Sequence, residues 1–117
     1  MEAIIIADVQ KQLDKFKNKK VYVHLETTTG MYASLMKEDA FSVGAFIRNA
    51  EVKFMNAKIV QAGKVFRVGL KMEMGWIYAE GLTDWTLHNE KQLLIAGHDQ
   101  EGRLMVTLQI SEAPFEN

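Results

Sequence analysis

The chain has 117 residues with 14 basic and 15 acidic side chains and no cysteine. This length fits one domain, expected over residues 1–117, and the lack of cysteine excludes disulfides, thiolate metal sites and cysteine nucleophiles. The net charge of −1 provides no basic excess for a phosphate backbone, so we expect no nucleic-acid partner. The sequence shows neither an export signal nor an apolar stretch long enough to span a bilayer, and we expect a cytoplasmic protein without a membrane partner.

The first predicted element is an α-helix over about residues 8–18. Asp8 is its expected N-cap, and Val9, Leu13 and Phe16 follow at helical spacing on one face. Lysines gather toward its C-terminal end, where positive charge suits the helix dipole. The apolar stripe is narrow, so the helix should pack as a lid on a larger structure.

From residue 21 to residue 111 the apolar pattern has a period of two, which predicts short β-strands. The strand patterns cover residues 21–26, 31–36, 41–55, 58–61, 66–74, 76–80, 85–87, 93–96 and 104–111. A turn is expected at Asn56-Ala57. Because the connections are too short for crossovers, neighbouring strands should be antiparallel. The predicted fold class is all-β, mainly antiparallel: a strongly curved sheet or small partly open barrel, one N-terminal α-helix and a short C-terminal tail.

The common catalytic and nucleotide-binding motifs are missing, which favours a non-catalytic protein over an enzyme. His24 and Glu26 lie two residues apart in a predicted strand and therefore point to one face. With His98 from another strand, they would provide two imidazoles and a carboxylate, a set that binds metals or exchanges protons. The alternative is a solvent-facing polar row. No closed ligand set is readable, so we expect no metal and no cofactor.

Arg48 lies in an otherwise apolar strand pattern. Strict alternation would place its guanidinium on the apolar face, and a buried arginine needs a carboxylate or several carbonyl partners. In a first arrangement it pairs inside the fold with Glu26 or Glu80. In a second, a bulge near Asn49 turns it outward. In a third, it binds an anion in the mouth of a barrel.

Three aromatic residues, Trp76, Tyr78 and Trp85, lie close together in the sequence. Trp76, Tyr78 and Glu80 share one strand face, and aromatic rings beside an acid can line a sugar or amine site. Large aromatic side chains more often anchor a core or an interface. Because several strands are apolar on both faces, we predict a homodimer, with an interface at these three aromatic residues, or a partner protein.

Four segments together resemble the YojF family of uncharacterised bacterial proteins: HLETT at residues 24–28, AFIRN at 45–49, GWIYAEGLT at 75–83 and AGH at 96–98. The resemblance extends over nearly the whole chain. It implies a small all-β fold, a cytoplasmic protein of Firmicute bacteria, and a homodimer. Genes of this family are expected beside a sugar N-deacetylase of bacillithiol synthesis. The family defines no residue roles, so none is transferred.

Two functions therefore follow as expectations. The first is a non-catalytic binding or accessory module that acts as a dimer or with a partner protein. The second is a small enzyme, or a metal- or sugar-binding protein, that uses a pocket formed by His24, Glu26, Arg48 and His98. The second requires these four side chains to converge, which the sequence does not decide.

Overall fold

The computed structural model describes residues 1–28 and 44–116. In that part the chain forms a helix, α1 (Ile6–Asp14), and the strands β1 (Glu2–Ala3), β2 (Val21–Thr28), β3 (Gly44–Val52), β4 (Phe54–Ala62), β5 (Val65–Met72), β6 (Trp76–Leu82), β7 (Asp84–His88), β8 (Gln92–His98) and β9 (Leu104–Ser111). The strand predicted at 31–36 lies outside the described residues. No helix in the described ranges has the length and apolar character to cross a membrane.

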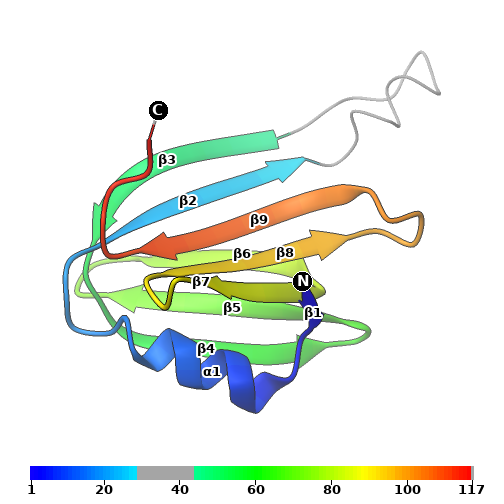
Figure 1. Ribbon diagram of the computed structural model, residues 1–117, viewed down its shortest axis with the longest axis horizontal. Coiled ribbons are helices and arrows are strands. Elements are labelled where there is room, and N and C mark those ends of the chain that lie inside the picture. Colours follow the sequence, from blue (N-terminus) through cyan, green and yellow to red (C-terminus); the bar gives the residue numbers. More distant parts are fainter. Residues whose placement is uncertain (29–43, 117) are drawn as a thin grey trace.

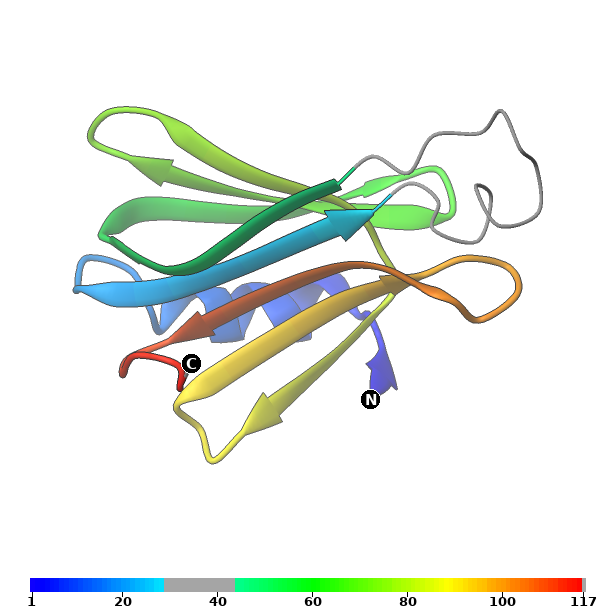
Figure 2. The ribbon, with the colours of Figure 1, turned by 90° about the horizontal axis from the view of Figure 1, so that it is seen from above.

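The strands form two antiparallel sheets (Figures 1 and 2). One has the order β1-β7-β8-β9-β2-β3, and the other has the order β4-β5-β6. This confirms the mainly antiparallel all-β class, although the two sheets do not close into a barrel. A single residue, Lys53, separates β3 from β4, so the chain passes directly from the larger sheet into the smaller one. The short connections from β4 to β5, β5 to β6, β7 to β8 and β8 to β9 require antiparallel neighbours, and the remaining strand pairs are antiparallel as well.

The apolar core lies between the two sheets and is closed by the helix. The larger sheet contributes residues such as Val23 and Leu108, and the smaller sheet contributes residues such as Leu70. From α1 and the turn after it, Leu13 and Phe16 are almost fully buried in the same core. The narrow apolar stripe predicted for the helix is therefore the stripe that seals the core.

The helix boundaries differ from the prediction of residues 8–18. The N-cap is Ile5, which makes no side-chain capping bond, and Asp8 lies in the first turn, so the predicted N-cap is wrong. The helix ends at Asp14, and a turn follows. Asn18 has a left-handed φ of 61°, and its N–H donates to the carbonyl of Phe54 at 2.8 Å. This bond to β4 directs the chain away from the helix axis.

The helix runs along β4, the edge strand of the smaller sheet (Figure 1). Gln10 Nε2 donates to the carbonyl of Ala57 at 2.8 Å, and the N–H of Ile59 donates to Gln10 Oε1 at 3.0 Å. The amide side chain thus takes the place of a neighbouring strand and satisfies backbone groups at an open edge. The turn predicted at Asn56-Ala57 is wrong, because β4 continues through both residues.

The two sheets come into backbone contact where the end of β6 meets β8. A Cβ atom on Gly97 would overlap the carbonyl oxygen of Gly81 and would lie 2.5 Å from Val106 Cγ1. Gly81 itself has a φ of 79°, a conformation that favours glycine. Glycine at both positions therefore allows backbone to lie against backbone at this crossing.

Substituting Gly97→Ala should lower the free energy of unfolding by about 3 kcal/mol, because the added methyl group overpacks a backbone contact that cannot yield. The control is Gly102→Ala, where φ is 79° but no atom lies within 4 Å of the new Cβ. That substitution should cost only about 1 kcal/mol of backbone strain. Urea melts of the three proteins measure both values, and equal losses would contradict the close crossing.

Candidate functional site

The outer face of the smaller sheet carries two large aromatic side chains that remain in contact with solvent. On β6, Ala79 points into the core and is 1% exposed, whereas Trp76 is 52% exposed and Tyr78 is 54% exposed. The prediction that Trp76 and Tyr78 share one strand face is therefore confirmed. They do not belong to the core, so core packing does not explain them.

The two rings form an ordered pair. Trp76 and Tyr78 stack with their ring centroids 5.6 Å apart and their planes 7° apart. Tyr78 lies over its cross-strand partner Gly69, where a Cβ atom would approach Tyr78 Cε1 to 3.1 Å. A glycine in mid-strand thus makes room for the ring. Lys71 Nζ lies 5.5 Å from the centroid of the Trp76 ring, a cation–π contact.

Charged side chains surround the rings. Arg67 Nη1 pairs with Glu80 Oε1 at 3.1 Å. Lys58 lies on β4, opposite Gly69 of β5. Met74 follows in the β5–β6 connection and is 89% exposed. We call this surface the aromatic face; it consists of Lys58, Arg67, Lys71, Trp76, Tyr78 and Glu80 on the three strands of the smaller sheet.

Trp85, the third aromatic residue predicted for an interface, lies elsewhere. It pairs with Ile95 in the larger sheet and packs, partly buried, against the core. The structure therefore separates Trp85 from the stacked pair on the smaller sheet.

The second candidate site lies on the outer face of the larger sheet. His24 is 5% exposed and lies between the rings of Phe46 and Phe115, at centroid distances of 5.1 and 6.3 Å. Arg48 Nη1 lies 3.4 Å from His24 Nδ1, and His24 Nε2 lies 3.3 Å from Glu26 Oε1. Because arginine can only donate, Nδ1 accepts and Nε2–H faces the carboxylate. His24, Glu26 and Arg48 thus form a chain of polar contacts.

Of the three arrangements considered for Arg48, the structure has the second, a bulge near Asn49. Val23 pairs with Ala50 and Leu25 with Ile47, so the strand opposite His24 contains one extra residue. Asn49 has the left-handed φ of 57°. The bulge reverses the alternation along β3, and the guanidinium lies beside His24 on the outer face. Pairing inside the fold with Glu26 or Glu80 does not occur, since these carboxylates contact His24 and Arg67.

The C-terminal segment folds back over this cluster, crossing from the end of β9 to β3 (Figure 1). Asn49 Nδ2 donates to the carbonyl of Phe115 at 2.8 Å, and the N–H of Phe115 donates to Asn49 Oδ1 at 2.7 Å. Arg48 donates to the carbonyl of Glu116, and its guanidinium lies 5.0 Å from the Phe115 ring centroid. Sequence reasoning missed Asn49 and Phe115 as partners. The only available signal was an aromatic residue in an otherwise polar tail.

His98 does not join the cluster. The strand register places Leu94, rather than His98, level with His24, which separates the two histidines by on the order of 15 Å. His98 Nδ1 instead donates to Asp84 Oδ1 at 3.2 Å. The hydroxyl of Thr83 also donates to Asp84. The pKa of Asp84 lies below its ordinary value mainly because of this bond from Thr83, and to a lesser degree because of the bond from His98, although burial acts in the opposite direction.

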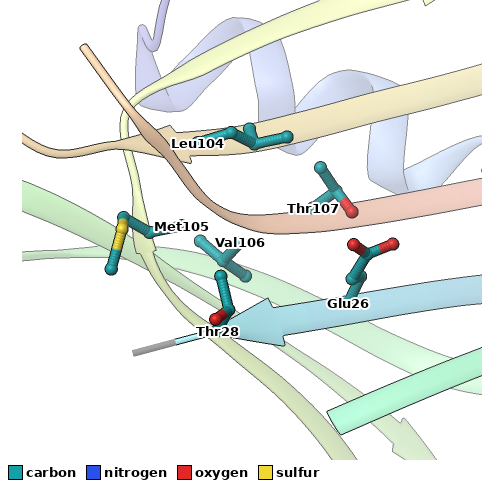
Figure 3. Close-up of a pocket in the computed structure, with 6 residues that line it drawn as sticks. All are labelled: Glu26, Thr28, Leu104, Met105, Val106 and Thr107. Atoms are coloured by element: carbon teal, nitrogen blue, oxygen red, sulfur yellow. The ribbon is translucent and has the colours of Figure 1, made fainter. Parts of the chain in front are cut away.

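The hollow beside Glu26 is too small to hold a ligand. Figure 3 shows it where β2 ends and β9 begins, with the Glu26 carboxylate beside the hydroxyl of its cross-strand partner Thr107. Its volume is about 20 Å³, roughly the space of one water molecule. Across the described ranges, no three His, Asp or Glu side chains gather to hold a metal ion. The four-residue pocket required for an enzyme therefore does not form as a unit.

The fold and its faces define a two-sheet antiparallel β-protein with one short helix, an exposed aromatic face and a docked C-terminal segment. A family model described as "Protein of unknown function (DUF1806)" matches residues 3–115. The uncharacterised protein YojF of Bacillus subtilis (strain 168) is 53% identical over 115 residues, which cover 98% of each chain. A crystal structure of Bacillus subtilis YojF matches with a TM-score of 0.80 and 51% identity, over 99% of this chain and 97% of that one. The chain belongs to this family, which confirms the resemblance read from the sequence.

Arg48→Ala should lower the free energy of unfolding by about 2 kcal/mol, because the substitution removes charge-assisted hydrogen bonds and a cation–π contact to the tail. Arg67→Ala is the matched control: it breaks one exposed ion pair, which is worth about 0.5 kcal/mol. Urea melts provide both numbers. If the two variants lose the same stability, Arg48 does not hold the C-terminal segment in solution.

Proposed function

We propose that this protein is a non-catalytic binding or accessory module, and that the aromatic face is its binding surface. The observation that carries the proposal is the stacked pair of Trp76 and Tyr78, each more than half exposed on a regular sheet. Tryptophan and tyrosine are the residues most enriched among those that dominate binding energy. An ordered, solvent-exposed pair of this kind also loses little conformational freedom when a partner covers it.

The surroundings of the pair support binding to a macromolecule. Met74, in the connection two residues before Trp76, is 89% exposed, and its flexible thioether can adapt to the shape of a partner. Arg67, Lys71 and Glu80 provide a charged rim of the type that surrounds protein interfaces. The rings lie on an open sheet surface, and the hollow of about 470 Å³ that Tyr78 and Glu80 border with Met105 and Val106 is wide open to solvent. Ligand pockets for small molecules enclose most of the ligand, so this open surface favours a protein partner.

Two occupants follow from the sequence, a second copy of the chain or a different protein, and the homodimer stays a prediction. The association with a sugar N-deacetylase of bacillithiol synthesis also stays an expectation from the family resemblance. None of the contacts described above bears on that association.

The cluster of His24, Glu26 and Arg48 supports a different role. Arg48 contacts His24 within the cluster. Arg48 and Asn49, the residues of the bulge, also bind the backbone of Glu116 and Phe115 in the C-terminal segment. We infer that this cluster anchors the C-terminal segment. A ligand-binding role would require that segment to move away.

Position-specific photocrosslinking tests whether the aromatic face binds a macromolecule. A benzoylphenylalanine residue placed at Trp76 should form a discrete covalent adduct when the protein is irradiated inside bacterial cells, because an occupant lies against that position. Thr86, on the outer side of the larger sheet, is the control position and should yield no such adduct. An adduct of twice the 13.3 kDa chain mass identifies a second copy, and a different mass identifies another protein. Equal labelling at positions 76 and 86, or no labelling at either, would contradict the proposal.

A further inference from the structure

We infer that the aromatic face is built for an acidic segment of a different protein rather than for a second copy of this chain. This inference rests on the proposed function and names the chemistry of the occupant. Its basis is the charge that surrounds the stacked rings, which differs from the charge of the chain as a whole.

The strand register places the charged residues of the face in rows. Lys58 lies opposite Gly69, which in turn lies opposite Tyr78, and Lys71 lies opposite Trp76. Arg67 lies two residues before Gly69 on the same face of β5 and pairs with Glu80. Three basic side chains thus share the face with one acidic side chain, although the whole chain has a net charge of −1.

The two lysines are the charges left to meet a partner. Glu80 is already engaged by Arg67 of the same chain, whereas neither Lys58 nor Lys71 forms an ion pair within the part of the chain that the structure describes. Lys71 is held over the Trp76 ring, so its ammonium group has a defined place beside the aromatic pair. Carboxylates of a partner can pair with both lysines while an apolar side chain covers the rings.

A second copy fits this charge pattern poorly. In a twofold face-to-face pair, each face meets its own pattern, so the two lysines without an intrachain ion pair in one copy meet the same two lysines in the other. The two Glu80 carboxylates cannot compensate, since each is paired with Arg67 in its own chain. Like charges brought together at an interface disfavour the complex.

A nucleic acid also fits less well than an acidic protein segment. Single-stranded nucleic acids bind grooves with a continuous track of positive charge, and stacked aromatic rings add to the affinity. This face has the stacked rings, but Glu80 lies beside them on the same strand, and the net charge of −1 does not attract a polyanion from a distance.

The test uses Trp76 as a single fluorescent reporter in a Trp85→Phe background. The probe is a short synthetic peptide in which Glu and Asp residues flank a central Leu-Phe pair, compared with the same peptide carrying Gln and Asn instead. The acidic peptide should change the Trp76 emission and bind about tenfold more tightly than its neutral counterpart. Lys58→Glu and Lys71→Glu should each weaken binding about tenfold, whereas Lys91→Glu, which changes the total charge equally at a distant turn, should not.

Equal binding of the two peptides, no binding of either, tighter binding of oligothymidine, or a Trp76 signal that depends on protein concentration alone would each overturn the inference. The last result would identify a second copy as the occupant. A crosslink at position 76 combined with any of these results would leave the binding function standing and refute only the acidic partner. Loss of both the crosslink and the peptide signal would refute the two proposals together.

Discussion

The close crossing of β6 over β8 is the constraint on which the other features depend. Backbone meets backbone at Gly81 and Gly97, so a side chain at position 97 would force the two sheets apart at this point. The crossing holds β6 against the larger sheet, and one side of β6 is buried there. Ala79 points inward, and the alternation along the strand then places Trp76 and Tyr78 outward. The aromatic face is therefore the side of β6 that stays outside when the two sheets pack together.

The single helix explains why that face stays open. α1 has nine residues, and it lies along the edge of β4, where Gln10 completes the backbone hydrogen bonds. A helix in this position seals the core but covers neither outer sheet surface. The larger sheet has its own partial cover in the C-terminal segment, which Arg48 and Asn49 hold through backbone atoms. The smaller sheet has no equivalent in the described part of the chain, and its exposed rings are available to a partner.

The sequence predicted what depends on local periodicity. Alternation identified β5, β6 and β9 and placed Trp76 and Tyr78 on a common face, because side chains in a strand alternate regardless of what surrounds them. It could not show which face is inward, since that depends on contacts between distant strands. The same limit explains why His98 could be grouped with His24, although it pairs with Asp84. A bulge was considered at Asn49, but the choice between arrangements required the register of β2 and β3.

If the aromatic face is a binding surface, the protein presents Trp76 to solvent until a partner covers it. Acrylamide quenching of two single-tryptophan variants, Trp85→Phe and Trp76→Phe, tests this claim directly in the isolated protein. Strong quenching is expected for Trp76, which is 52% exposed, and weak quenching for Trp85, which packs against the core. The difference should persist over a range of protein concentrations. If Trp76 is shielded as well as Trp85, the aromatic face is already covered and the account is wrong.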